Sequence, residues 1–131
     1  MLVKDVMTKK ENLVMLSPMA SIRDILNLMK KTGVRSIIID KTKPSDAYGI
    51  LTYKNILKSI VAEDGDIDML NAYDICSKPA LQISHNLDIK YAAQMMITSS
   101  IKRLLVIDNN EISGILTMTD IIEAVMELAE D

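Results

Sequence analysis

Residues 114–122 read GILTMTDII and repeat the pattern of residues 49–57, which read GILTYKNIL. The first four residues are identical in the two stretches, and an apolar pair closes each of them. The second copy carries the acidic Asp120 where the first copy carries the neutral amide Asn55. A phrase that recurs within one chain indicates a duplicated structural unit, so the fold is built from two equivalent halves.

The similarity between the halves extends upstream of this phrase. The segment 21–31 corresponds to 88–98, and the opening DVMTK at 5–9 corresponds to DICSK at 74–78. Each unit therefore has about sixty residues, with small length differences in its loops. We expect one module over residues 1–131, composed of a first unit at 1–62, a linker at 63–72 and a second unit at 73–131.

Each unit begins with a strand pattern followed by a helix pattern. Short apolar stretches at 14–16 and 80–83 follow turn-forming residues, which is typical of strands. Apolar residues then recur at helical spacing after Ser21 and Asp88, whose side chains suit the N-cap position of a helix. Gly33 follows the first of these helices, as a terminating glycine does.

Two further strands and a second helix complete each unit. The strands are expected at 36–39 and 48–52, mirrored at 104–107 and 112–117. The resulting order is β-α-β-β-α, a mixed α+β or α/β arrangement. A unit of this size buries too little apolar surface to be stable alone. We therefore expect the two units to pack about a pseudo-twofold axis.

Composition and charge narrow the function. Apolar residues make up 49% of the chain, charged residues 25%, and the net charge is −3 with a pI near 5.1. This balance is typical of a globular protein and argues against nucleic-acid binding through bulk positive charge. No stretch is long and apolar enough for a membrane span, and none reads as a signal peptide. With one cysteine and no partner for it within the chain, a cytoplasmic location is expected.

The residues needed for catalysis or metal binding are not grouped in the sequence. The four glycines are too scattered for a phosphate-binding P-loop. The single histidine, His85, and the single cysteine, Cys76, exclude His-rich zinc sites and CxxC pairs. Cys76 aligns with Met7, which indicates a packed position rather than a nucleophile. We therefore expect a protein that is not an enzyme and has no metal site.

The repeated phrases, the KRLLVID segment (102–108) and the paired openings together resemble a tandem pair of CBS domains. The resemblance covers essentially the whole chain and implies a Bateman module. In that family, paired units form clefts that bind adenosine-containing ligands such as AMP, ADP, ATP or S-adenosylmethionine. The resemblance thus implies a regulatory module that needs no cofactor, takes an adenine nucleotide and forms homodimers.

The family's binding roles fall on the end of the second phrase. The resemblance assigns phosphate contacts to the hydroxyl groups of Thr117 and Thr119, and the ribose hydroxyls to Asp120. A carboxylate accepts hydrogen bonds from both hydroxyls of a diol, and a helix N-terminus attracts phosphate. The alternative is structural: Thr117 and Asp120 also have the spacing of a helix capping box. Both roles can coexist.

Further residues are assigned to the same cleft, which the family shares between its units. Positive charge for the phosphates is expected from Lys102, Arg103 and Arg35, although these can also be ordinary solvated charges at strand starts. Thr8 and Val14 come from the opening of the first unit, Val34 flanks the adenine, and Ile115 supplies an apolar wall.

A second cleft is expected to bind more weakly. It involves Thr52, Asn55, Ser77 and Leu81. The amide of Asn55 offers one uncharged acceptor, which holds a ribose diol less firmly than a carboxylate does.

Three functions remain open at this point. The first is a non-enzymatic sensor for AMP, ADP or ATP that signals occupancy to a partner, with S-adenosylmethionine as another ligand. The second is a purely structural dimerisation module with empty clefts. Nucleic-acid binding is the third and least favoured. Self-association is expected because the second helices leave Ile60 or Met126 with more apolar neighbours than one pair of units can cover.

Overall fold

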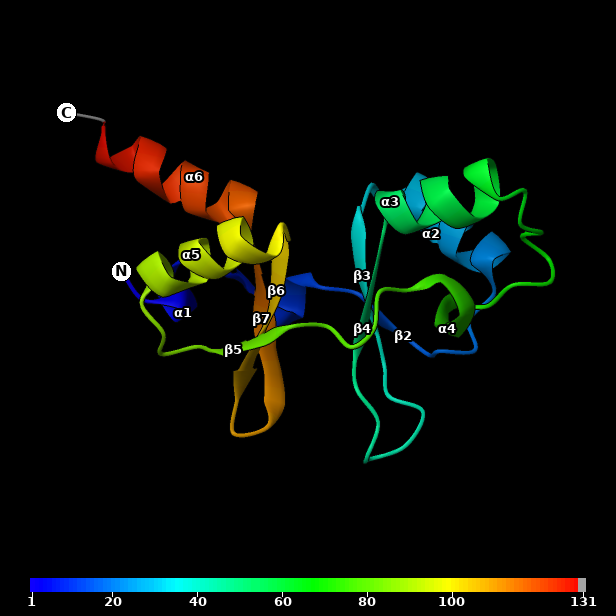
Figure 1. Cartoon of the computed structure of the whole chain (residues 1–131), viewed down its shortest axis with the longest axis horizontal. Helices are drawn as coiled ribbons and strands as arrows, with labels where there is room; N and C mark the ends of the chain where they lie inside the picture. Colours follow the sequence, from blue (N-terminus) through cyan, green and yellow to red (C-terminus); the bar gives the residue numbers. More distant parts are fainter. Residues whose placement is uncertain (130–131) are drawn as a thin grey trace. The chain divides into compact units, whose positions relative to one another are not determined.

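The computed structural model describes residues 1–129 and divides into two compact units, which do not coincide with the two sequence repeats (Figure 1). One unit combines Met1–Leu13 with the chain from Leu81 on, and the other is Val14–Ala80. Each repeat thus gives its opening segment to the unit built mainly from the other repeat. We refer to them as the discontinuous unit and the continuous unit.

The opening segments change units because their apolar residues are buried there. Val3, from α1 (Val3–Val6), lies fully buried among core residues of the second repeat such as Leu104 and Leu116. Ala72 and Ile75, from α4 (Ala72–Ile75), lie in the core of the first repeat. The sequence repeats therefore describe the duplication, whereas the compact units describe which residues share a core.

The discontinuous unit contains a four-stranded sheet in the order β1-β7-β6-β5. Strands β6 (Arg103–Asp108) and β7 (Glu111–Thr117) form an antiparallel hairpin, and β5 (Gln82–Ser84) runs parallel to β6. The short β1 (Thr8–Lys9) pairs antiparallel with β7. The opening of the chain is thereby hydrogen-bonded to the strand that contains the second repeated phrase.

The continuous unit contains a three-stranded sheet in the order β2-β3-β4. Strands β3 (Ser36–Ile39) and β4 (Gly49–Thr52) are antiparallel, and β2 (Met15–Leu16) runs parallel to β3. A β-bridge between Ile50 and Ser77 takes the place of a fourth strand. The predicted strand positions are confirmed to within about two residues, the usual uncertainty at element ends.

Two longer helices lie on each unit's sheet. In the discontinuous unit they are α5 (Ile89–Ser99) and α6 (Met118–Leu128). In the continuous unit they are α2 (Ile22–Thr32) and the helix formed by α3 (Tyr53–Ile56) and η2 (Leu57–Ala62). A 3-10 turn, η1 (Lys10–Asn12), follows β1. The order strand, helix, strand, strand, helix is therefore present twice.

The predicted helix caps are confirmed. The Ser21 hydroxyl accepts a hydrogen bond from the Asp24 amide at 3.1 Å, and the Asp88 carboxylate accepts one from the Lys90 amide at 2.9 Å. Gly33 ends α2 with φ of +77°, in the left-handed region that favours glycine. Ser100 ends α5 in the same conformation with φ of +53°.

The second helix of the first repeat differs from its counterpart. Where α6 is α-helical throughout, η2 is a π-helix closed by a bond from the Glu63 amide to the Lys58 carbonyl. Its wider turns were not expected from the apolar spacing, which fits either type of helix over so few residues. Single π-turns are frequent at functional surfaces.

The equivalent helix ends at Gly33 and Ser100 allow a test of backbone strain. Gly33→Ala should lower the free energy of unfolding by about 1 kcal/mol, because a side chain makes the left-handed conformation costly and no atom within 4 Å of the added methyl compensates. Ser100→Gly should raise it by about 0.5 kcal/mol for the opposite reason. Urea denaturation measures both values; a stabilising Gly33→Ala would contradict this account.

Candidate functional site

The glycine of each repeated phrase permits the opening segment to cross β7 or β4 closely. A Cβ atom added to Gly114 would collide with the Thr8 carbonyl oxygen and lie 3.0 Å from the Met7 sulfur. A Cβ added to Gly49 would lie 2.7 Å from the Cys76 sulfur. Gly is thus required because another backbone approaches, which is one of its common uses in strands.

The register of this crossing puts two hydroxyl side chains in equivalent positions. Thr8 lies opposite Ile115 in the β1–β7 pair. Ser77 lies opposite Ile50, with both backbone bonds of the bridge at 2.9 Å. Each hydroxyl is therefore set beside the end of the strand where the second helix of its unit begins.

In the discontinuous unit this hydroxyl meets the acidic residue of the phrase. The Thr8 hydroxyl donates to the Asp120 carboxylate, 3.4 Å from each oxygen. The capping box is present as well: the Asp120 amide donates to the Thr117 hydroxyl, and the Thr117 amide donates to Asp120, both at 3.0 Å. Asp120 is therefore oriented from two sides while keeping acceptor capacity, since a carboxylate has about four lone-pair positions.

In the continuous unit the equivalent hydrogen bond runs in the opposite direction, from the phrase residue Asn55 to the hydroxyl of Ser77. The Asn55 side-chain oxygen accepts from the Thr52 amide at 2.8 Å and from the Thr52 hydroxyl at 3.2 Å. Its amide nitrogen donates to the Ser77 hydroxyl at 3.1 Å. The single carbonyl oxygen already accepts two bonds, which is the number of its lone pairs. Asn55 therefore has little capacity left to accept from a ligand hydroxyl.

The cations of the two sites also differ. Arg103 lies opposite Thr117 across the β6–β7 hairpin, so both side chains are on the same face of the sheet. Arg103 is half-buried, and this burial lowers the pKa of its guanidinium, which nevertheless remains charged at neutral pH because a guanidinium is a very strong base. The equivalent residue opposite Thr52 is Ser36, which is uncharged.

The lysine that follows each hydroxyl residue differs as well. Lys78 forms an ion pair with Asp46, in which both side chains are about one-fifth exposed. The Lys78 ammonium and hydrogen bonds from Thr42 hold the pKa of the Asp46 carboxyl well below its usual range. Lys9, its counterpart, is exposed in β1. The positive charge at the opening of the second repeat is thus already neutralised.

The start of α6 changes one sequence-based interpretation. The Met118 amide donates to the Lys102 carbonyl at 2.9 Å, and the Asp120 amide donates to Thr117. Two of the first amide groups of the helix are therefore bonded within the protein. A phosphate at this position would rely more on the exposed side chains of Lys102 and Thr119 than on the helix end.

The structure brings together part of the predicted site. Seven of the predicted residues lie in the discontinuous unit: Thr8, Lys102, Arg103, Ile115, Thr117, Thr119 and Asp120. Ile115 is only 2% exposed, so little of its side chain is accessible for the expected apolar wall. Three others lie in the continuous unit: Val14, Val34 and Arg35. Their contribution to a shared cleft stays a prediction.

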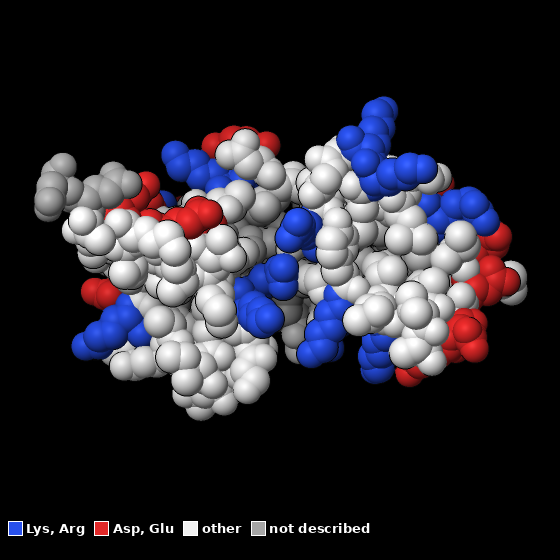
Figure 2. Space-filling view, turned by 90° about the horizontal axis from the view of Figure 1, so that it is seen from above, with Lys and Arg blue, Asp and Glu red and all other residues white. Residues whose placement is uncertain are grey.

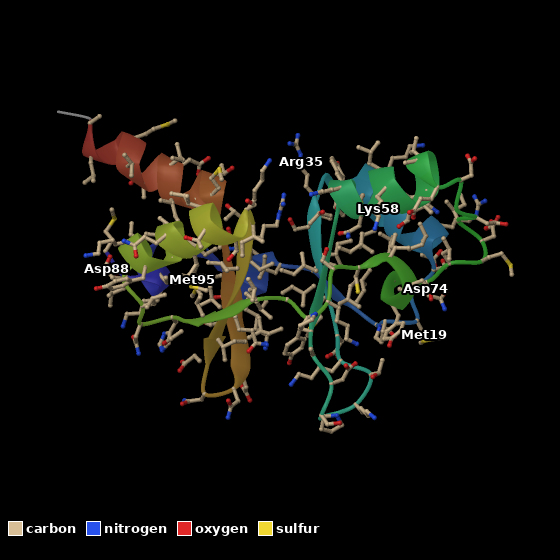
Figure 3. The ribbon with its side chains drawn as sticks, in the orientation of Figure 1. Met19, Arg35, Lys58, Asp74, Asp88 and Met95 are labelled. Atoms are coloured by element: carbon tan, nitrogen blue, oxygen red, sulfur yellow. The ribbon has the colours of Figure 1, made fainter. Side chains whose placement is uncertain are left out.

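Arg35 occupies the position equivalent to Lys102. It is exposed, projects from the start of β3 (Figure 3), and its guanidinium lies 5.8 Å from the centre of the Tyr53 ring. In the weaker site, Thr52, Asn55 and Ser77 are close together in the continuous unit. Leu81 lies in the discontinuous unit instead, at the start of its second segment, where its carbonyl accepts a hydrogen bond from the Leu105 amide.

Cys76 occupies the packed position predicted from its alignment with Met7. It contacts the core of the continuous unit, and burial raises the pKa of its thiol. A raised pKa keeps the sulfur protonated at neutral pH, the opposite of what a nucleophile requires.

Sequence analysis missed the side-chain contacts Thr8–Asp120 and Asn55–Ser77. The sequence did contain a signal for them: the alignment of DVMTK with DICSK makes Thr8 equivalent to Ser77, just as Asp120 is equivalent to Asn55. Their separation of 112 residues in one case and 22 in the other conceals the equivalence until the exchange of openings is known.

Over 1–129, no group of three or more His, Cys, Asp or Glu side chains is arranged to hold a metal ion. The helices of that same part are all too short or too polar to cross a bilayer.

The chain belongs to the CBS domain family, whose model matches residues 3–62 and 72–127. It is 29% identical over 108 residues to an uncharacterized protein of Methanopyrus kandleri, covering 82% of this chain and 55% of that protein. It is 28% identical over 119 residues to the CBS domain-containing protein YhcV of Bacillus subtilis, covering 91% and 81%. The chain spans 59% and 42% of two further archaeal relatives.

Solved structures of CBS proteins share this fold. A hexameric CBS-CP12 protein from bloom-forming cyanobacteria is 26% identical with a TM-score of 0.85, covering 100% of this chain and 76% of that one. CBSX2 in complex with AMP is 20% identical with a TM-score of 0.80, covering 98% of each chain. The CBS domain of a bacterial CNNM/CorC Mg²⁺ transporter in complex with ATP is 20% identical with a TM-score of 0.80, covering 95% and 87%.

We expect Gly114 and Gly49 to differ in how well they tolerate an added methyl group. Gly114→Ala should destabilise the protein by about 2 kcal/mol or more, because the methyl collides with backbone that is fixed in the sheet. Gly49→Ala should cost about half as much, since its nearest neighbour is a side-chain sulfur that can rotate away. Thermal unfolding of the two variants measures the difference, and equal losses would show that the Thr8 backbone yields as readily as the sulfur.

Proposed function

We propose that this protein is a non-enzymatic regulatory module that binds an adenine nucleotide, such as AMP, ADP or ATP, and signals occupancy to a partner. The observation that carries the proposal is the environment of Asp120. Its carboxylate is oriented by Thr8 and Thr117, retains acceptor capacity and lies on the same strand-to-helix junction that Arg103 faces. A ribose diol needs such an acceptor, and a phosphate needs such a cation.

The comparisons support this class of ligand. The structure of CBSX2 contains AMP, and that of the CNNM/CorC CBS domain contains ATP. Both are CBS pairs of the same fold as this chain, and the residues at its own strand-to-helix junction are of the kinds that such ligands require. We take the adenine nucleotide as the ligand, with S-adenosylmethionine as the competing candidate. The expected setting is the cytoplasm, where a free cysteine stays reduced.

A structural role is favoured for the corresponding junction of the continuous unit. The two bonds accepted by the Asn55 oxygen and the Lys78–Asp46 ion pair leave this junction internally satisfied. We therefore propose one principal nucleotide site rather than two equal ones. The same module without any ligand, acting only in dimerisation, is the alternative that a binding experiment excludes or supports.

The difference between the junctions predicts unequal effects of substitution. Asp120→Ala should weaken AMP binding at least tenfold, about 1.4 kcal/mol, because charge-assisted hydrogen bonds contribute roughly 1.5–3 kcal/mol each. Asn55→Ala should change the affinity of the tighter site less than about threefold, since its oxygen is already satisfied. Isothermal titration calorimetry with AMP measures both.

A matched control separates ligand contact from helix capping. Asp120→Asn reproduces the side chain found at Asn55, so it should keep most of the cap while losing the charge. Its melting temperature should stay near that of the wild type, and its AMP affinity should fall like that of Asp120→Ala. If Asn55→Ala abolishes binding instead, the principal site lies in the other junction. If no adenine ligand stabilises the wild type at millimolar concentration, the nucleotide proposal is wrong.

We also propose that the module self-associates as a homodimer. Met126 is 63% exposed on α6, as the sequence predicted, whereas Ile60 is half-buried and its neighbours Leu57 and Val61 are each 62% exposed. Exposed apolar side chains that lie together on a helix face are typical of protein–protein contact surfaces. Sedimentation equilibrium at tens of micromolar should give about twice the chain mass of 14.6 kDa. A single species at the chain mass would contradict the proposal.

A further inference from the structure

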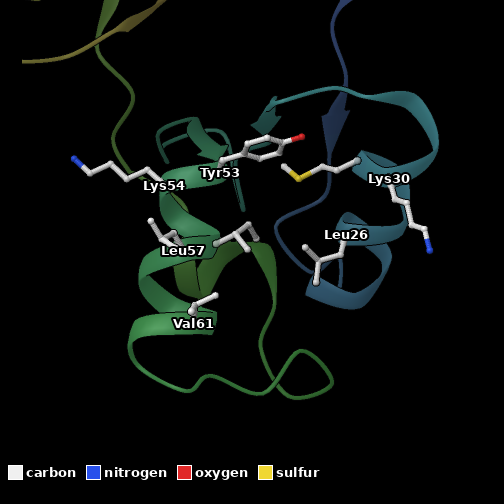
Figure 4. Close-up of a pocket in the computed structure, with 8 residues that line it drawn as sticks. Leu26, Lys30, Tyr53, Lys54, Leu57 and Val61 are labelled. Carbon is white, nitrogen blue, oxygen red and sulfur yellow. The ribbon is translucent and has the colours of Figure 1, made fainter.

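The continuous unit has an apolar groove between α2 and the α3–η2 helix (Figure 4). Its volume is about 520 Å³, within the range of roughly 300–1,000 Å³ that is usual for small-ligand sites. Leu26 and Met29 of α2 line one side, and Ile56, Leu57 and Val61 line the other. These five side chains form a floor that suits a hydrocarbon chain.

The polar groups of this groove lie at its margins. Lys30 and Lys54 complete the lining together with Tyr53, and Figure 4 shows the two ammonium groups pointing away from the floor at opposite ends. None of the eight residues that line the groove is acidic. On the face of the continuous unit seen in Figure 2, basic side chains lie around a broad uncharged area, and acidic ones gather at one end. A bound molecule therefore meets apolar side chains along its length and positive charge at its ends.

The second repeat is an internal reference for these charges. The positions of the apolar floor are again apolar there, whereas Ile97 stands at the position of Lys30 and Thr119 at that of Lys54. Because the two repeats share one fold, the fold itself does not require a lysine at either position. Cations beside an apolar floor are thus a feature that the first repeat has and the second lacks, and they favour an anionic ligand.

We propose that this groove binds a fatty acid anion, with its hydrocarbon chain on the apolar floor and its carboxylate at the margin beside Lys30 or Lys54. The chain gains by leaving water, and the carboxylate avoids the cost of burying a charge because it stays hydrated at the exposed margin. Lysine suits this margin, since its stem covers apolar surface while its ammonium group stays in water. Each end of the groove has one lining lysine, which matches the single charge of a carboxylate.

This site is independent of the proposed nucleotide site. No residue that lines the groove is among those assigned to either nucleotide junction. Substitutions in the groove should therefore leave AMP binding unchanged, and the failure of one proposal leaves the other standing.

Ligands with one chain length and different head groups test the role of the charge. Decanoate should bind about threefold or more tighter than decanol, because exposed charge pairs add a modest attraction. Lys30→Gln/Lys54→Gln should remove this preference by weakening decanoate about threefold, with decanol changed less than about twofold. Isothermal titration calorimetry below the critical micelle concentration measures both ligands. Equal affinities for decanoate and decanol in the wild type would overturn the proposal.

The control for the lysine variant is Lys43→Gln/Lys90→Gln. Both of these lysines are exposed and lie outside the groove, and the change in net charge is the same. This control should bind decanoate like the wild type. A loss equal to that of the groove variant would overturn the proposal in favour of a nonspecific charge effect.

Exposed positions test the apolar floor without disturbing the core. Leu57 is 62% exposed, and Ile122, its counterpart on α6, is 47% exposed. Leu57→Gln should weaken decanoate and decanol alike by about threefold or more, because the chain loses apolar contact. Ile122→Gln should change neither ligand. Equal losses in the two variants would show that the chain binds exposed apolar surface in general, contrary to the proposal.

Methionine methyl groups locate the bound chain. Met29 lines the groove, and Met96 is its counterpart in the second repeat; they are 5% and 3% exposed. In protein labelled with carbon-13 at the methionine methyl groups, decanoate should shift the NMR signal of Met29 and leave that of Met96 in place. Met29→Leu and Met96→Leu identify the two signals. A Met29 signal that does not respond to decanoate at any concentration below micelle formation would overturn the proposal.

A second copy of the chain is the competing occupant, because Leu57 and Val61 also belong to the surface from which self-association is proposed. A chain in the groove and a second copy over it compete for these two side chains, so decanoate should raise the dimer dissociation constant in analytical ultracentrifugation. A dimer that decanoate leaves intact, with no shift of Met29, would identify the second copy as the occupant and overturn the proposal. A wild-type protein that is monomeric throughout would contradict self-association alone, since the Met29 signal still decides the groove.

Discussion

The close crossing of the opening segments over Gly114 and Gly49 is the constraint on which both units depend. At each crossing there is no room for a side chain on the strand, so the backbone of the opening segment can pair with it. This pairing fixes Thr8 beside Asp120 and Ser77 beside Asn55. It also brings α1 and α4 to the cores in which Val3 and Ala72 are buried. One glycine in each phrase thus links the sheet, the core and the candidate site.

The direction of one hydrogen bond then separates the two halves. A carboxylate can only accept, so the Thr8 hydroxyl must donate to Asp120, whereas the amide of Asn55 donates to Ser77. The first arrangement leaves acceptors available, and the second uses them for the helix cap. Two further differences make the continuous unit less suited to an anionic ligand at its junction: Ser36 stands where the other unit has Arg103, and the charge of Lys78 is paired with Asp46. A duplicated unit has thereby acquired two chemically different junctions without a change of fold.

The internal repeat made most of the fold predictable. Strand alternation, the caps at Ser21 and Asp88 and the glycine after α2 are local signals, and the structure contains all of them. The exchange of opening segments was not predictable, because it depends on which core buries Val3 and Ala72 rather than on any local pattern. For the same reason Asp120 could be selected from its position in the phrase, whereas its contact with Thr8 could not. The π-helical form of η2 was not predictable either, because the spacing of apolar residues does not distinguish helix types over six residues.

The division into a continuous and a discontinuous unit has a consequence for synthesis on the ribosome. All residues of the continuous unit, Val14–Ala80, have been made before β6 and β7 appear, so its sheet and helices can begin to assemble first. In the other unit, residues 1–13 stay without their partner strand until β6 and β7 have been made. Its closure brings together distant parts of the chain and is correspondingly slow. The half that carries Asp120 is therefore the last to assemble, and a chain interrupted before β6 lacks the proposed nucleotide site.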